Sequence, residues 1–365
     1  MSQRVLESAD RGRSRPQWDA ALSLTRLTAT LMIVACHMMQ WADCELAWWF
    51  NVGVQIFFCM SGCLYGVREI RDDLGFYRRS FSKILLDYYI VVIPAIVVYR
   101  LLQPELLSQS KAVGMLLTTE TVTGGGHLWF ISYILFCYAL TPFLNRLLGR
   151  LLERGGIVRH FFALALLLAL VRVVTTRFMD GHFDAPWISC YLLGLFLGTL
   201  TRYGRKGERI CFCGLAVVMA VGLNTVQIAT NYTDLSLYAI LFRGHFSDSY
   251  YEFCQYAHTF LGVACFLLLR VLFALLLKGG DWLARPLRGL GRLSDHYSYQ
   301  VYLVHHWAIL GPFSLMAWTP RLSVNLLLIA GWIVLAVAAV TLTRRLLLWG
   351  SRQWRRLCFP EGSVG

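Results

Sequence analysis

Arg26 and His37 are the residues of this chain whose types and spacing point most directly to chemistry. They bracket the segment RLTATLMIVACH, and the ten residues between them carry no charge. Eleven helical steps end within about 20° of three full turns, so both side chains share one helix face, about 16 Å apart along the axis. Ionisable groups in an apolar helix usually face a protein interior or a water-filled cavity. The pair therefore favours a polar cavity in which His37 takes a proton from a hydroxyl or briefly carries a group itself.

Each residue of the pair also has a simpler interpretation. Arg26 alone is compatible with a side chain that snorkels to the membrane interface, and a lone His37 with a packing histidine whose hydrogen bonds are satisfied. Their common helix face is what favours the cavity.

Two other apolar segments carry polar side chains that could line such a cavity. Ser61 follows Phe57-Phe58 and precedes a glycine, and small residues let helices approach closely. His127 and Trp129 follow the run GGG at the start of another apolar segment. The alternatives are a Ser61 that bonds to a backbone carbonyl, a His127 exposed in a loop, and a Trp129 in an interfacial aromatic belt.

A polar stripe marks the segment LSDHYSYQVYLVHHW. Ser298, Tyr302 and His305 follow the spacing i, i+4, i+7, and Tyr299 and His306 form a neighbouring stripe. Helices that face lipid do not carry such stripes, so we expect this one to face the interior of a bundle.

Three basic residues, Arg78, Arg79 and Lys83, precede the third apolar segment. Such a cluster can bind the phosphates of an anionic substrate. An ordinary cytoplasmic loop of a membrane protein has the same composition, so the cluster alone does not choose between the two.

These residues require membrane-spanning helices to position them. The chain has 365 residues, of which 57% are hydrophobic and only 15% charged, and this composition is unusual for a soluble protein. Repeated long apolar runs predict an all-α integral membrane protein with about ten spans. The predicted spans lie at roughly 21–42, 47–66, 84–102, 128–145, 160–176, 184–200, 210–230, 253–277, 294–315 and 322–343.

The distribution of basic residues supports this topology. With a cytoplasmic N-terminus, the six inner segments hold 26 of the 34 Lys and Arg residues, and the outer loops hold four. This is the bias of the positive-inside rule, and it predicts that both termini are cytoplasmic. The net charge of +13 follows from the same bias, which indicates contact with anionic lipid headgroups and not with nucleic acid. We expect a polar tail over 1–20, a membrane domain over 21–343 and a basic tail over 344–365.

The motifs together resemble the acyltransferase-3 family of integral membrane acyltransferases. Arg26–His37 is similar to that family's basic-x10-His motif, and Phe57-Phe58-x-x-Ser61-Gly62 to its FFxxSG element. Three later elements also match in order along the chain, at His127-Leu128-Trp129-Phe130, Tyr191-Leu192-Leu193-Gly194 and Ser298-Tyr299-x-x-Tyr302-Leu303-x-His305.

The resemblance implies transfer of an acyl group, most often acetyl from acetyl-CoA, to a hydroxyl of a cell-surface or lipid-linked glycan. It implies a multi-pass protein of the bacterial inner membrane with no tightly bound cofactor and no metal. Arg26 would help to hold the CoA moiety, and His37 would act as the catalytic base or acyl relay. The cluster of Arg78, Arg79 and Lys83 would contact the CoA phosphates. Ser61, His127, Trp129 and the stripe of Ser298, Tyr299, Tyr302 and His305 would line the substrate path.

One stretch departs from the family pattern. Relatives often carry Arg-x-x-Arg before the third span, and here Ser80 stands at the first of these positions while Lys83 stands at the second. We also expect no appended esterase-like domain, so either the membrane core delivers the acyl group itself or a separate extracytoplasmic protein completes the transfer. The alternative function is a glycan or lipid transporter without acyl-transfer chemistry, or an inactive relative that serves as a partner subunit.

Overall fold

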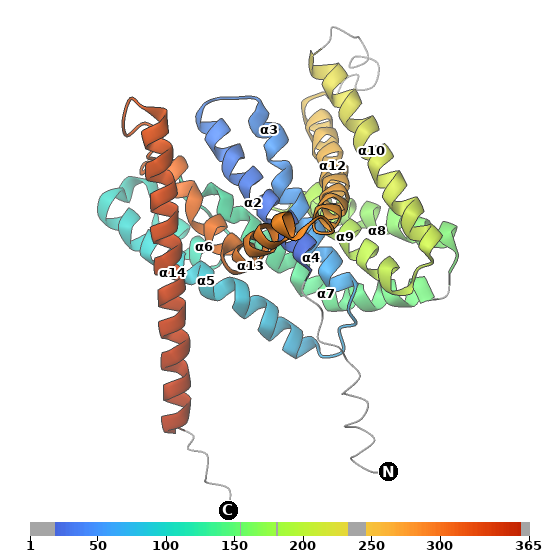
Figure 1. Ribbon diagram of the computed structural model, residues 1–365, viewed down its shortest axis with the longest axis horizontal. Coiled ribbons are helices and arrows are strands. Elements are labelled where there is room, and N and C mark those ends of the chain that lie inside the picture. Colours follow the sequence, from blue (N-terminus) through green and yellow to red (C-terminus); the bar gives the residue numbers. More distant parts are fainter. Residues whose placement is uncertain (1–18, 154, 180–181, 233–245, 359–365) are drawn as a thin grey trace, which may run out of the picture.

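The computed structural model describes residues 19–153, 155–179, 182–232 and 246–358. Within these ranges the protein is all-helical and contains no strand. The helices pack into one bundle, and α14 stands along one edge of it (Figure 1). The elements are α2 (Ala20–Trp41), α3 (Leu46–Phe50), α4 (Val52–Gly66), α5 (Asp73–Leu102), η1 (Pro104–Leu106), α6 (Gln109–Leu116), η2 (Gly126–Leu128), α7 (Trp129–Glu153), α8 (Ile157–Phe178), α9 (Ala185–Tyr203), α10 (Lys206–Tyr232), α12 (Phe246–Leu276), α13 (Asp281–Ile309) and α14 (Leu322–Cys358).

Every predicted span falls on helical structure, and the span at 47–66 comprises the two successive helices α3 and α4. Among the described residues, eight helical segments are long and apolar enough to cross a membrane, with α3 and α4 counted as one segment. The two predicted spans outside this set fall on α9 and α13. The structure therefore shows a multi-pass helical membrane protein, while the count of ten spans and the cytoplasmic termini remain predictions.

Several helix boundaries differ from the predicted ones. α5 begins at Asp73 and not near residue 84, so Arg78, Arg79 and Lys83 lie on a helix and not in a loop. The reason is a cap: the Asp72 carboxylate accepts a hydrogen bond of 2.8 Å from the Gly75 amide. α13 ends at Ile309, six residues before the predicted end at 315, and α14 continues without interruption beyond 343.

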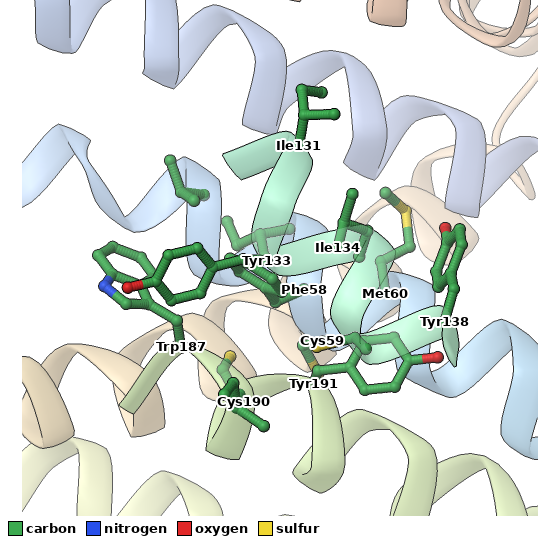
Figure 2. Packing of buried hydrophobic residues seen from close by; sticks show 14 of the residues in the cluster. Phe58, Cys59, Met60, Ile131, Tyr133, Ile134, Tyr138, Trp187, Cys190 and Tyr191 are labelled. Atoms are coloured by element: carbon green, nitrogen blue, oxygen red, sulfur yellow. The ribbon is translucent and has the colours of Figure 1, made fainter. Parts of the chain in front are cut away.

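α9 lies at the centre of the bundle, and all its residues from Ala185 to Leu200 are buried. Glycines allow its close packing against α4. A Cβ at Gly194 would lie 2.0 Å from the Cys59 carbonyl oxygen, and a Cβ at Gly62 would lie 2.1 Å from the Tyr191 carbonyl oxygen. The close approach predicted at Ser61-Gly62 is therefore present. Figure 2 shows the packing that results, in which aromatic and sulfur-containing side chains of α4, α7 and α9 interdigitate.

The helices that carry the predicted chemistry also pack together. α2 lies against both α13 and α4. The Asp19 side chain caps α2 by accepting a hydrogen bond of 3.0 Å from the Leu22 amide. This packing brings the Arg26–His37 face of α2 against the polar stripe of α13.

Candidate active site

Four histidines from three parts of the chain meet in one layer. His37 of α2 lies between His305 and His306 of α13, with ring centroids 5.1 and 4.4 Å away. His127 of η2 completes the layer, and its ring stacks on that of His306 at 4.6 Å. We call these four residues the histidine layer. His37 is half-buried, whereas the other three side chains are buried.

Each imidazole of the layer has one nitrogen opposite an oxygen that can only accept a hydrogen bond. The partners are Gln40 Oε1 at 2.7 Å for His37 Nδ1 and the Gly124 carbonyl at 2.7 Å for His306 Nδ1. His127 Nε2 lies 3.2 Å from the Leu303 carbonyl, and His305 Nδ1 lies 2.8 Å from the carbonyl of Tyr302. These contacts place one proton on each ring and fit four neutral imidazoles. In this arrangement His37 keeps the lone pair of Nε2 free to take a proton.

The loop before η2 needs its glycines. Gly124 has a φ of +84°, and Gly311, after α13, has a φ of +89°. The two residues touch, since a Cβ on Gly311 would lie 2.4 Å from Gly124 Cα. Only glycine adopts both the backbone conformation and the close contact at no steric cost. The run GGG therefore positions the Gly124 carbonyl that accepts from His306.

A cavity of about 320 Å³ lies beside the layer, between α2, α4, α5, α7 and α13. We call it the Arg26 cavity. Its walls include six of the residues that the sequence predicted for the site, namely Arg26, Ser61, Lys83, Ser298, Tyr299 and Tyr302. Apolar side chains such as Phe57, Met60 and Phe130 complete them.

A second cavity of about 280 Å³ adjoins the first, and the two share Tyr65, Arg68, Ser80 and Lys83 as lining residues. We call it the Arg79 cavity, because Arg79 lies on its wall together with Arg71. Five basic and three acidic side chains line the two cavities, namely Arg26, Arg68, Arg71, Arg79 and Lys83, and Glu69, Asp72 and Asp295. An anionic group is therefore favoured along this route.

Arg26 is paired with a carboxylate that the sequence analysis did not single out. Its guanidinium donates to Asp295 of α13, and Ser23 donates to the other oxygen of Asp295 at 2.7 Å. Asp295 also lines the Arg26 cavity. Its position three residues before Ser298, on the same polar stripe, was the signal that could have identified it.

The Arg26 cavity ends just short of the histidine layer. Ile33, Phe130 and Tyr302 line it, whereas His37 does not, although His37 lies one helical turn beyond Ile33 on α2. Tyr302 belongs to both places: it lines the cavity, its hydroxyl donates to the His127 carbonyl oxygen, and its ring centroid lies 5.2 Å from that of His127. Tyr302 therefore separates the cavity from the layer.

Some predicted residues lie elsewhere. Arg78 is exposed on α5 and lines neither cavity. Trp129 packs in an aromatic cluster, with ring centroids 4.9 Å from Tyr133 and 4.8 Å from Trp187. His127 is buried, which excludes the exposed-loop alternative.

Other residues of the site were missed. Gln40 and Arg68 were not singled out, and His306 was noticed only as part of a stripe. Arg68 is held in place by Asn145, whose side-chain amide donates to the Arg68 carbonyl oxygen at 2.8 Å. The i, i+3 spacing of His37 and Gln40 on α2 was a local signal for their contact, whereas the contact of Arg68 with Asn145 joins distant parts of the chain and has no local sequence pattern.

The described part of the chain contains no group of three His, Cys, Asp or Glu side chains with the geometry to hold one metal ion. The hydrogen bonds of the histidine layer turn one nitrogen of each ring toward a backbone or amide oxygen. These contacts fix the orientation of the four rings and leave the second nitrogen of His37 available for proton transfer.

Comparisons with known proteins agree with the motifs. The family model Acyl_transf_3, described as an acyltransferase domain, matches residues 19–343. The match includes α2, α13 and every helix that lines the two cavities. No curated protein and no solved structure matches the chain.

Proposed function

The chain belongs to the acyltransferase-3 family and is a multi-pass membrane acyltransferase, and from this premise we propose that it is an O-acetyltransferase of the bacterial inner membrane. Its donor is acetyl-CoA, which binds as a substrate. Its acceptor is a hydroxyl of a cell-surface or lipid-linked glycan. Membrane lipid surrounds the bundle, and neither nucleic acid nor a tightly bound cofactor takes part.

One observation carries this proposal. A cavity with a basic mouth leads along the Arg26–His37 face of α2 and ends at Tyr302, beside four histidines. A CoA thioester is anionic at its phosphates and apolar at its acyl end. The cavities have the same order of polarity, since charged side chains line the Arg79 cavity and apolar side chains complete the Arg26 cavity. Arg68, Arg79 and Lys83 would contact the CoA phosphates. Arg26 would contact a part of the donor that lies deeper in the Arg26 cavity.

The chemistry assigned to His37 is general base catalysis. Its Nε2 takes the proton of the acceptor hydroxyl while the hydroxyl oxygen attacks the thioester carbonyl. The C–S bond then breaks, the acetyl ester forms, and CoA leaves as a thiol after it receives a proton from His37. In a covalent acetyl-His37 relay, Nε2 first attacks the thioester and the CoA thiolate leaves with the Nδ1 proton of the acetyl-imidazolium; the acceptor hydroxyl then attacks the acetyl group, the C–N bond breaks, and the hydroxyl proton returns to the imidazole, with the same products.

Because the cavity stops at Tyr302, the reaction requires a movement of the Tyr302 side chain. The ring separates the donor side from the histidine layer, so its rotation would connect them. We propose that the donor reaches the cavity from the cytoplasm and the acceptor reaches the layer from the other side. A separate extracytoplasmic protein would be needed only if the final acceptor lies beyond the reach of the membrane core.

The test is mass spectrometry of surface glycans and glycolipids from cells with the wild-type gene, a deletion, His37→Ala or His296→Ala. We expect an acetyl group in the wild type that disappears with the deletion and with His37→Ala. His296→Ala is the matched control, because His296 is an exposed histidine on α13 outside both cavities. Full acetylation by His37→Ala would overturn the mechanism. Glycans of unchanged mass that fail to reach the surface in the deletion would favour a transporter.

A further inference from the structure

A third cavity, unrelated to the predicted site residues, lies at the edge of the bundle between α5, α13 and α14. Its volume is about 530 Å³, and we call it the α14 slot. Almost all of its wall is apolar. The lining includes Ile90 and Tyr99 of α5, Trp307 of α13, and Ala336, Ala339 and Thr343 of α14.

The shape of the slot follows from small side chains on α14. Ala336 and Ala339 line it where larger residues of the same helix, such as Leu335, point away from it. α14 contacts α13 more closely than α5, which leaves room between α14 and α5. Both α5 and α14 are long and apolar enough to span a membrane, so the slot lies at bilayer depth.

The slot is about one leaflet deep and closed at one end. Its α5 wall runs from Ile90 to Tyr99, which corresponds to about 14 Å, close to half of a hydrocarbon core of about 30 Å. Beyond Thr343 the next residue, Arg344, bonds to the buried Asp87 carboxylate at 3.2 Å, and Gln300 donates to the same oxygen at 2.9 Å. This polar contact joins α5, α13 and α14 and closes the slot at that end.

The other end of the slot reaches the wall of the histidine layer. Trp307 lines the slot, and its ring centroid lies 5.4 Å from that of His127. Tyr99 also lines the slot, and its hydroxyl donates to the carbonyl oxygen of Thr123. The next residue in the chain, Gly124, accepts from His306. One layer of aromatic side chains thus separates the slot from the layer.

We propose that the α14 slot binds the hydrocarbon anchor of a lipid-linked acceptor, and that this anchoring places the hydroxyl-bearing headgroup beside the histidine layer. The proposal rests on the proposed function and specifies the acceptor class, a lipid-linked saccharide as opposed to a free one. An apolar slot of this length that is closed at the Arg344 end fits one long chain entering from the end near Leu102 and Ile309. The charge pattern predicts that this end faces outward.

Binding can be measured without any activity. The purified full-length protein would carry a diazirine amino acid in place of Ala339 or, as a control, of Leu335, which is exposed on α14 but does not line the slot. The nanodiscs would contain phosphatidylethanolamine, phosphatidylglycerol and a small fraction of undecaprenyl phosphate as the probe. After photolysis at position 339, we expect the share of undecaprenyl phosphate among the captured lipids to exceed its mole fraction in the nanodisc at least fivefold. After photolysis at position 335, we expect each lipid to be captured in proportion to its mole fraction. Equal, proportional capture at both positions would show bulk lipid only and would overturn the proposal.

Activity provides a second and separate test. Ala339→Trp fills the slot, and Leu335→Trp adds the same side chain to the same helix outside it. We expect Ala339→Trp to lower acetyl transfer to an undecaprenyl-linked saccharide at least tenfold and to leave transfer to the free saccharide unchanged, with Leu335→Trp normal on both. Normal transfer to the lipid-linked saccharide by Ala339→Trp would overturn the slot. Absence of transfer in the wild-type protein would instead contradict the proposed function, while the photolysis result would still decide whether the slot binds the anchor.

Discussion

His37 depends on Gln40, which lies one helical turn away on α2. The amide oxygen of Gln40 faces His37 Nδ1 at 2.7 Å, and this contact holds the proton on Nδ1 and the lone pair on Nε2. We expect Gln40→Leu to lower kcat by up to about 100-fold with little change in the donor KM, because the ring loses its orientation and its fixed tautomer. Steady-state kinetics with purified protein measures both parameters.

Gln40→Glu is the control for this prediction, since it keeps an acceptor oxygen at the same distance. It should recover most of the activity that Gln40→Leu loses. If both variants have the same kcat, or if KM alone changes, Gln40 does not position the base.

Asp295 is the ion-pair partner of Arg26, the residue that we propose contacts the donor. Its carboxylate holds Arg26 and Ser23, and about a quarter of each charged side chain is exposed, at 24% for Arg26 and 26% for Asp295. If the proposed function holds, an anionic donor competes with Asp295 for Arg26. We expect Asp295→Asn to lower the donor KM about two- to fivefold, since partly exposed ion pairs contribute up to about 1 kcal/mol. Measured with Arg26→Ala in the background, the same substitution should have no effect on KM.

The residues of the site differ in how far the sequence alone could identify them. Arg26 and His37 were predicted as a pair because both lie on one helix, where spacing fixes the common face. Asp295 is 269 residues from Arg26 in the sequence, and no periodicity links them. The contact depends on the packing of α2 against α13, so only the three-dimensional arrangement reveals it.

At the scale of elements, the α4–α9 contact determines how the site helices are supported. A Cβ at Gly194 would lie 2.0 Å from the Cys59 carbonyl oxygen, a backbone atom that cannot move without displacing α4. We expect Gly194→Ala to lower the free energy of unfolding by about 1–3 kcal/mol or more. The lowered stability can be measured by heating the purified protein and using size-exclusion chromatography to determine how much of it stays monodisperse at each temperature.

Gly214→Ala is the matched control for Gly194→Ala. Gly214 lies on α10 with no atom near the position of its Cβ, so alanine there should be neutral or slightly stabilising, because glycine is unfavourable within a helix. Equal stability of the two variants would mean that α4 and α9 are not in close contact in the membrane.

The sequence predicted where the membrane-spanning helices lie more accurately than it predicted the residues at which they begin and end. Long apolar runs identified every predicted span as a helix. The early start of α5 has a local signal in the Asp72 cap, which hydropathy does not register. The end of α13 at Ile309 has none in hydropathy either, because the chain turns at Gly311 against Gly124 of a distant loop.

At the scale of the whole molecule, the site needs two different sides. The proposed donor binds at the basic cavities near the α4–α5 connection, whereas the histidine layer lies near the ends of α2 and α13. Between them, α13 is too polar to count among the eight apolar segments, yet its residues from Gln300 to Ile309 are almost all buried. α2 and α14 both pack against α13, and the polar stripe faces the Arg26 cavity and the histidine layer, which explains how such a helix could cross a bilayer.

Whether α13 crosses, and in which direction, follows from cysteine accessibility. In a variant without the eleven native cysteines, single cysteines would replace Arg71, Lys111, Lys278 or Trp318, all of which are exposed. We expect a membrane-impermeant maleimide to label positions 111 and 318 in intact cells, and positions 71 and 278 only after permeabilisation. This result would place the two ends of α13 on opposite sides of the membrane. It would also show that the basic cavities open to the cytoplasm, where acyl-CoA is. Labelling of 278 and 318 from the same side would mean that α13 does not span, and labelling of position 71 in intact cells would put Arg79 out of reach of the donor.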